Sequence, residues 1–99
     1  MRMQSHYTGR KVIDEHGLVL GVVTDVVYDA HTQRPEYLVV NPGPLRRSHY
    51  VPVHGAAEID DGTIVVPWDK DWFKLAPAAN GHSGLRPRDR RELESHYAR

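Results

Sequence analysis

The sequence predicts an all-β fold, a small and partly open antiparallel β-barrel of about six strands with a short helical turn and a C-terminal helix. Three observations lead to this prediction. Short runs of valine, isoleucine and leucine recur along the chain, and β-branched residues suit a pleated surface. Turn-forming residues separate these runs at short intervals. The chain also has only 99 residues, which is enough for one domain with a modest core.

The first half of the chain supplies three strands, which read GRKVID, LVLGVVTDVVYD and EYLVVN. In the second of them, Leu20 and Val23 flank Gly21, and unbroken alternation would place these two large residues on opposite faces. A bulge or sharp bend at Gly21 would return both to the core, which is how small barrels turn corners. Beyond the bend, alternation places Val27 on the face of Val23, and Val26 on the other face.

The second half completes the barrel. The stretch NPGPLRRS breaks the chain with two prolines and a glycine, and HYVPVHGAAEID follows as a strand. Pro52 in this strand cannot donate to a ladder, so it belongs on an edge or at a bulge. Asp61 and Gly62, flanked by AAEI and TIVV, are the strongest short-range hairpin signal in the chain. Six short strands joined by short turns predict an antiparallel meander that closes into a barrel.

The period changes in the stretch PWDKDWFKLAP. Trp68, Trp72 and Leu75 recur at helical spacing, Asp69 stands where a capping residue would, and Pro77 ends the segment. We therefore expect one or two helical turns over residues 69–75, which lay an aromatic lid on an open end of the barrel.

The predicted organisation is an N-terminal lead (1–8), the barrel domain (9–77), a flexible linker AANGHSG (78–84) and a helical tail (85–99). The tail helix should start near Pro87. Its apolar stripe is narrow, since only Leu93 and Tyr97 stand one turn apart, and Arg90 can pair with Glu94 along the helix. Such a helix is marginal alone and needs the barrel or a partner to hold it.

Composition favours a cytoplasmic protein that does not insert into membranes. The chain has no cysteine, its first ten residues lack the apolar core of a signal peptide, and its aliphatic runs are far shorter than a membrane span. Thirteen basic residues balance thirteen acidic ones, so the strong positive field of most non-specific nucleic-acid binders is absent.

The runs GRKVIDEHGLVLGVVTDVVYD, EYLVV, YVPV and DDGTIVV together resemble a PRC-barrel domain. The resemblance covers about residues 9–77 and includes a G-x-x-x-G-x-V-x-D element at Gly17, Gly21, Val23 and Asp25. The family is named for the cytoplasmic domain of the photosynthetic reaction-centre H subunit, and it includes the C-terminal domain of the ribosome-maturation protein RimM. The tail ending in HYAR is similar to free-standing bacterial members. The resemblance implies a barrel used for docking and assembly, not an enzyme.

Side-chain chemistry supports the same expectation. Seven histidines suggest a metal, but His49 and His54 lie five residues apart, on opposite faces of a regular strand, without a third ligand nearby. Asp25 and Asp29 could form an acid-base pair, yet a strand carboxylate often bonds a neighbouring turn, and aspartate commonly begins a turn. We expect no catalytic residues, no metal and no cofactor.

The function predicted from the sequence is a non-catalytic module that forms a homodimer and docks a protein partner. The barrel rim and the tail helix would form the contact, with arginines on the rim adding specificity. The alternative is an RNA- or ribosome-associated maturation factor, in which tyrosines could stack on bases. Trp68, Trp72 and Phe73 are expected in core and lid, and not in an exposed ligand cage. The predicted partner-binding residues are Trp72, Phe73, Leu93, Tyr97, Arg46 and Arg47.

Overall fold

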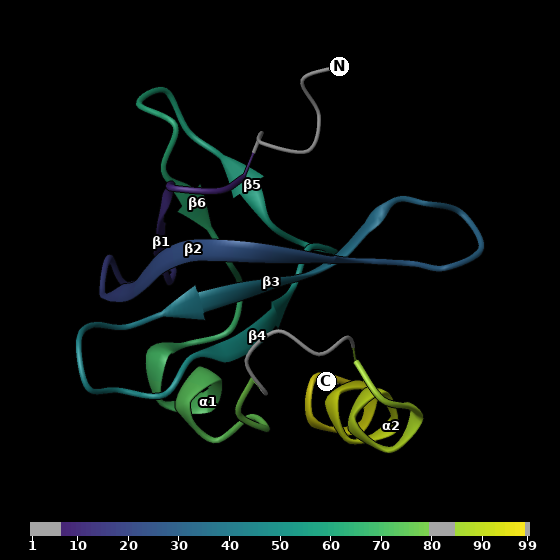
Figure 1. The fold of residues 1–99 in the computed structure, drawn as a ribbon. Helices are drawn as coiled ribbons and strands as arrows, with labels where there is room; N and C mark the ends of the chain where they lie inside the picture. Colours follow the sequence, from purple (N-terminus) through teal and green to yellow (C-terminus); the bar gives the residue numbers. More distant parts are fainter. Residues whose placement is uncertain (1–6, 80–84, 99) are drawn as a thin grey trace.

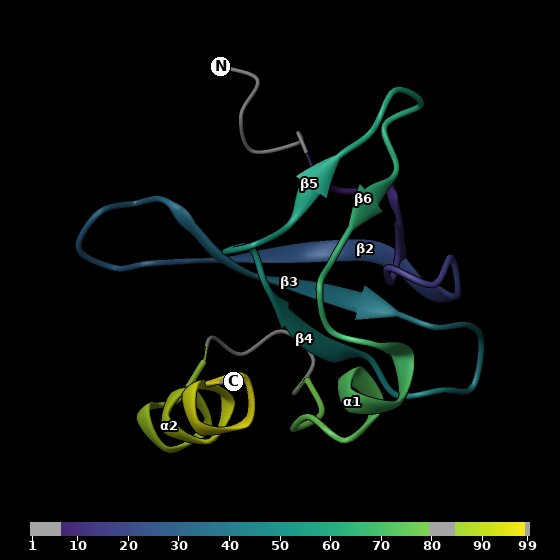
Figure 2. The same ribbon diagram turned by 180° about the vertical axis from the view of Figure 1, so that it is seen from behind.

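A computed structural model describes residues 7–79 and 85–98 of the chain. Six strands form one curved sheet, a half-barrel, in the order β4-β3-β2-β1-β6-β5, and two helices lie together beyond β4 (Figures 1 and 2). The predicted fold class is therefore confirmed. The elements are β1 (Lys11–Ile13), β2 (Val19–Tyr28), β3 (Pro35–Asn41), β4 (His49–Pro52), β5 (Ala57–Glu58), β6 (Ile64–Val65), α1 (Lys70–Lys74) and α2 (Pro87–His96).

One strand pair departs from the predicted meander. β1 pairs with β6 in parallel, with Val12 opposite Ile64, whereas the other four pairs are antiparallel. The β5–β6 hairpin attaches to the free edge of β1, where the N–H of Val66 donates to the carbonyl of Ile13 at 3.0 Å. Spacing along the chain predicts hairpins between consecutive strands, but it cannot predict which edge a later hairpin will cover.

The bend predicted at Gly21 is present. Gly21 has φ = 153° and is buried, and both Leu20 and Val23 are in the core with 1% of their surface exposed. A Cβ atom on Gly21 would stand 2.2 Å from the carbonyl oxygen of Asn41. The bend therefore also brings two backbones closer than any side chain permits.

A second irregularity corrects the predicted faces of β2. Val23 pairs with Val40 and Asp25 with Val39, so Thr24 is an extra residue that resets the alternation. Val26 therefore points into the core, and Val27 is only half-buried. Strict period-two alternation from Val23 predicted the reverse, because nothing in the sequence marks the bulge.

The core fills the concave side of the sheet and continues under both helices. It contains two tyrosines from β3 and β4, whose rings meet edge to face at 6.3 Å. Its buried hydrophobic residues are Val12, Leu20, Val23, Val26, Tyr37, Leu38, Val40, Tyr50, Val51, Ile64, Val66, Phe73, Ala76, Leu93 and Tyr97. In residues 7–79 and 85–98, no helix is long and apolar enough to cross a membrane.

The short helix α1 forms where residues 69–75 predicted it, but it faces the core differently. Phe73 is fully buried, whereas Leu75 is 69% exposed, so the spacing of Trp68, Trp72 and Leu75 did not identify the buried face. A helix of five residues is too short to form an apolar stripe over two turns, so helical spacing does not predict which of its residues is buried. In α1 the buried residue is Phe73. Asp69 stands at the N-cap, yet its side chain makes no capping hydrogen bond.

The buried Asp14, at the end of β1, caps α1 from a distance. Its carboxylate accepts hydrogen bonds from the backbone N–H groups of His16 and Leu18, both at 2.9 Å, and of Lys70 at 3.0 Å. Burial raises the pKa of the Asp14 carboxyl, but the backbone donors of Leu18, Lys70 and His16 together lower that pKa below its ordinary value. An ionised Asp14 therefore fixes the start of α1 against the turn after β1.

Helix α2 begins at Pro87, as predicted, and ends at His96. The predicted linker 78–84 is described only in part. Ala78 forms a bridge with His49, and the N–H of Ala79 donates to the carbonyl of Ser48 at 2.8 Å. The remaining linker residues, 80–84, and most of the predicted N-terminal lead lie outside the described residues.

Candidate functional site

The C-terminal helix packs on the barrel of its own chain. Leu93 is fully buried there, and Tyr97 is 8% exposed. The hydroxyl of Tyr97 donates a hydrogen bond to the backbone carbonyl of Tyr50 at 2.7 Å. Burial raises the pKa of Tyr97 far above its ordinary value, because the ionised phenolate would lose its hydration. This stripe of two residues is therefore part of the chain's own core, and Tyr97 is fixed to β4.

Trp72 of α1 and His96 of α2 join the two helices. The indole Nε1–H donates to the backbone carbonyl of His96 at 2.9 Å, and the imidazole Nε2 is 2.7 Å from the carbonyl of Trp72. The two rings stack with centroids 4.3 Å apart and an interplanar angle of 9°. Trp72 thus contacts the tail helix, as a lid residue would, and it remains partly exposed.

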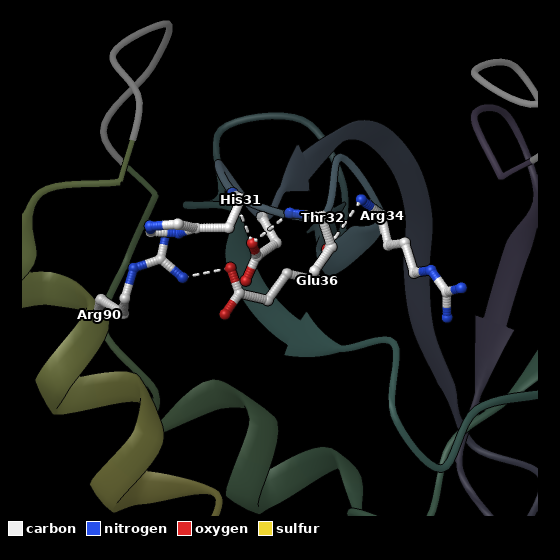
Figure 3. Close-up of polar contacts among 6 residues, drawn as sticks. His31, Thr32, Arg34, Glu36 and Arg90 are labelled. Atoms are coloured by element: carbon white, nitrogen blue, oxygen red, sulfur yellow. Dashed lines mark hydrogen bonds and ion pairs between the residues drawn. The ribbon is translucent and has the colours of Figure 1, made fainter.

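An ion pair joins the first half of α2 to the start of β3. The guanidinium of Arg90 bonds the carboxylate of Glu36, and the hydrogen bond to Glu36 raises the pKa of Arg90 (Figure 3). The sequence suggested that Arg90 would pair with Glu94 on the same helix. The structure corrects this, since Glu36 offers a half-buried carboxylate from the barrel.

The six predicted partner-binding residues divide into three groups, the first of which is Trp72 alone, partly exposed between the two helices. Phe73, Leu93 and Tyr97 are inside the chain, and Phe73 also packs edge to face on the ring of His49 at 5.5 Å. Arg46 and Arg47 are exposed on the loop between β3 and β4. The structure thus does not bring all six residues onto one face.

Arg46 and Arg47 belong to a larger surface at one end of the sheet. There the turn between β1 and β2, the loop between β3 and β4, and α1 lie near one another (Figure 1). Two adjoining shallow hollows connect these segments, and both are lined by Pro42, Arg46 and Lys74. We call this surface the apolar-basic rim. It comprises the hollow-lining residues Val19, Arg46, Arg47, Lys70 and Lys74, and the exposed Leu45, which stands between the lining residues Pro44 and Arg46 in the loop.

Leu45 is the rim residue that sequence reasoning missed. Its side chain is fully exposed at 106%, and its backbone has φ = 65°, in the left-handed region that leucine rarely adopts. The signal was available in the stretch NPGPLRR, where a large apolar residue stands in a turn built of proline and glycine.

The residues considered for catalysis or metal binding have local structural roles. Asp29 Oδ1 accepts hydrogen bonds from the N–H groups of His31 at 2.7 Å and Thr32 at 2.9 Å, and these donors lower the pKa of the Asp29 carboxyl. Asp25 Oδ1 accepts from the N–H of Val26 at 2.8 Å. These contacts fix turn and strand geometry and do not bring the two carboxylates to a shared site.

The histidines of the strand region do not converge. His49 Nδ1 lies 2.7 Å from the carbonyl oxygen of Ala76, and this contact ties β4 to the end of α1. His54 is exposed beyond the end of β4. Within the described ranges, 7–79 and 85–98, no three His, Cys, Asp or Glu side chains are grouped so that they could hold a metal ion.

Comparison with known proteins identifies the barrel. The family model described as PRC-barrel domain matches residues 4–73. Among solved structures, the chain is similar to RimM from Pseudomonas aeruginosa, which is described as a 16S ribosomal RNA processing protein, with 28% sequence identity and a TM-score of 0.54. The match covers 69% of this chain and 44% of that one, so the chain spans less than half of the RimM length. No curated protein matches.

Proposed function

Because the chain belongs to the PRC-barrel domain family, we propose that it is a non-catalytic assembly module, which forms a homodimer and docks a protein partner. Two separate surfaces would serve these contacts. The apolar-basic rim would dock the partner, and exchange of α2 between two chains would form the dimer. The candidate catalytic carboxylates, Asp25 and Asp29, are already used by nearby backbone groups, which supports a non-catalytic role.

Leu45 is the observation that carries the docking proposal. Its side chain is fully exposed, so it adds nothing to the core, and its φ of 65° places strain on the fold. Asparagine or glycine would suit this position better, since an ordinary residue in the left-handed region costs about 1–2 kcal/mol. A strained and exposed leucine is explained if a partner buries it.

The surroundings of Leu45 indicate the chemistry of that partner. Arg46 and Arg47 follow it in the loop, and Lys70 and Lys74 of α1 line the adjoining hollows. An apolar centre within a basic border fits a protein surface with an apolar pocket bordered by carboxylates. The arginines would add register and specificity more than affinity.

A single substitution tests the rim. Leu45→Asn removes the apolar side chain and relieves backbone strain, so the variant should be at least as stable as the parent. Tagged chains would be used to capture proteins from a lysate of the source cells, followed by mass spectrometry. The matched control is Ile59→Asn, which removes a 46%-exposed apolar side chain in the turn between β5 and β6.

The expected result is a protein that the parent and Ile59→Asn retain and that Leu45→Asn loses. A protein retained equally by all three chains would contradict docking through the rim. Replacing Arg46 and Arg47 by glutamate should abolish capture of the same protein, because an acidic partner surface would then be repelled.

The proposed homodimer would use the other predicted residues. Phe73, Leu93 and Tyr97 are buried within one chain, so they can reach a second copy only if α2 leaves its own barrel and packs on that of the partner. Exchange of an identical element is a low-cost route to dimers, since every contact is kept. Light scattering of the full chain should report a dimer, and a chain that stays monomeric at high micromolar concentration would reject it.

The ion pair between Glu36 and Arg90 allows a sharper test of exchange. Glu36→Arg and Arg90→Glu each place like charges at the contact, and in each variant alone this repulsion is the same in the monomer and in an exchanged homodimer. When the two variants are mixed, an exchanged heterodimer places the barrel of one variant against the helix of the other, with opposite charges at both contacts. The mixture should therefore form heterodimers in native mass spectrometry. Arg91→Glu, on the exposed side of α2, is the matched control and should not complement Glu36→Arg.

A second candidate function is an RNA- or ribosome-associated factor. It is supported by the similarity to the RimM structure and by the four basic residues of the rim. If this function is correct, nuclease treatment should remove the captured material. Binding to a structured RNA should also weaken steeply with salt, with a log-log slope that falls by about 1 for each rim cation replaced.

A further inference from the structure

A cleft of about 400 Å³ lies between the turn after β1 and the segment that leads into α1. Its walls combine two indole rings with two carboxylates and an imidazole. The lining residues are Glu15, His16, Pro67, Trp68, Asp69 and Trp72. Both tryptophans of the chain therefore border one hollow. Neither the docking rim nor the exchange of α2 explains the two carboxylates.

Asp14 holds the two walls of this cleft together. Its carboxylate binds the N–H of His16 in one wall and the N–H of Lys70 in the other, so the two segments are held at a fixed separation. Asp14 also performs the capping that Asp69 would otherwise supply. The side chain of Asp69 makes no capping hydrogen bond and remains exposed at the cleft, together with Glu15.

The aromatic walls are held rigidly. Trp72 is stacked on His96 and donates its indole N–H to the backbone of α2 at 2.9 Å. Trp68 meets the ring of Tyr97 edge to face with centroids 4.9 Å apart. Because both rings are partly exposed and fixed by neighbours, little conformational entropy is lost when a ligand packs on them.

Indole faces and carboxylates attract the same kind of ligand. A cation over an indole ring gains about 0.5–2 kcal/mol, and tryptophan is the best aromatic partner. A carboxylate adds a charge-assisted hydrogen bond. A pair of acidic residues alone would mark only a solvated surface, but here the pair borders a hollow with two aromatic walls. The cleft is therefore suited to a cation that has a flat, weakly hydrated face.

We propose that this cleft binds an arginine side chain presented by a partner protein. The guanidinium group is planar, stacks on aromatic rings and bonds carboxylates through several N–H groups at once, whereas an ammonium group is compact and strongly hydrated. The cleft itself follows from the geometry above. The source of the arginine, a partner protein, rests on the proposed assembly function.

Intrinsic fluorescence gives a reporter confined to this site, because the chain has two tryptophans and both line the cleft. The full-length protein would be titrated at pH 8 and low salt with acetyl-Gly-Arg-Gly-amide. Two further peptides would carry citrulline, which keeps the shape and removes the charge, or lysine. The arginine peptide should produce a saturable change, and the citrulline peptide should bind at least about tenfold more weakly, which corresponds to about 1.4 kcal/mol.

A pair of double variants completes the test. Glu15→Gln with Asp69→Asn should weaken binding of the arginine peptide by about tenfold or more. The control, Glu92→Gln with Asp60→Asn, makes the same chemical changes at exposed positions away from the cleft and should stay within about twofold of the parent. Circular dichroism verifies that both variants are folded.

Each outcome decides the proposal. Equal binding of the citrulline peptide, or equal binding by the cleft variant and the control, would overturn recognition of a cation here. Equal binding of the lysine peptide would overturn the assignment to arginine. These titrations use free peptides and no partner protein, so they can fail while the Leu45 and α2 experiments succeed, and the reverse also holds.

Discussion

The close approach at Gly21 yields a prediction whose size follows from the structure. In Gly21→Ala the new Cβ would lie 2.2 Å from the carbonyl oxygen of Asn41 and 2.6 Å from its carbon. Such contacts normally require more than about 3 Å, so β2 must move away from the end of β3 by about 1 Å. The movement weakens one or two ladder hydrogen bonds near Val22 and Asn41, each worth about 0.5–1.5 kcal/mol. Backbone strain at φ = 153° adds about 1 kcal/mol.

The expected loss of unfolding free energy is therefore about 3 kcal/mol, a large share of the roughly 5–15 kcal/mol typical of a domain. Gly17→Ala is the matched control. Gly17 has φ = 85°, but a Cβ atom there would have no other atom within 4 Å, so only about 1 kcal/mol of strain applies. Both variants change glycine to alanine, and their effects on the unfolded chain cancel. Urea unfolding followed by tryptophan fluorescence measures the difference. Equal midpoints for the two variants would refute the close approach as the reason for glycine at position 21.

Three further predictions concern polar groups. Asp14→Asn should cost about 1–3 kcal/mol at pH 7, since a charged acceptor of three backbone bonds is replaced. The folded pKa of Asp14 is lowered, so the stability that its carboxylate contributes is present above the unfolded pKa of about 4 and is lost as pH falls through the folded pKa. The unfolding free energies of parent and variant, measured with urea, should therefore differ at pH 7 and approach each other as the pH falls below about 4. Tyr97→Phe removes the hydrogen bond to the Tyr50 carbonyl and should lower the free energy of unfolding by about 0.5–1.5 kcal/mol at pH 7. An unchanged urea midpoint would argue against that bond. Burial raises the pKa of Tyr37 to about 12 and also raises the pKa of Tyr97. Above about pH 10 these tyrosines ionise in the unfolded chain while they stay neutral in the folded one. The free energy of unfolding of the parent should therefore decline as pH rises above about 10. Tyr97→Phe should decline less than the parent between pH 9 and pH 11, and equal slopes would contradict the burial of this phenol.

Features encoded by neighbouring residues were predictable from the sequence. Gly21 between Leu20 and Val23 indicated a bend, and the Asp61–Gly62 pair indicated a hairpin, because a few adjacent residues determine each feature. Features that depend on distant partners were not. The carboxylate that caps α1 comes from a residue 56 positions earlier, and no spacing rule connects Asp14 with Lys70. The acidic wall of the cleft depends on that same contact, which is why the tryptophans alone suggested only core and lid.

The docking of α2 shows the same limit and bears on the proposed dimer. The stripe of Leu93 and Tyr97 is too narrow to hold a helix alone, and the sequence therefore pointed to an additional surface. On that surface, Trp72 bonds His96, which lies 24 positions away in the sequence. Tyr50 bonds Tyr97 across 47 positions, and Glu36 bonds Arg90 across 54 positions. Each of these contacts would be identical whether barrel and helix belong to one chain or to two. They therefore stabilise the monomer and an exchanged dimer equally. Protein concentration and the segment between barrel and helix decide between the two states, so mixing variants tests exchange in a way that measuring the stability of the helix cannot.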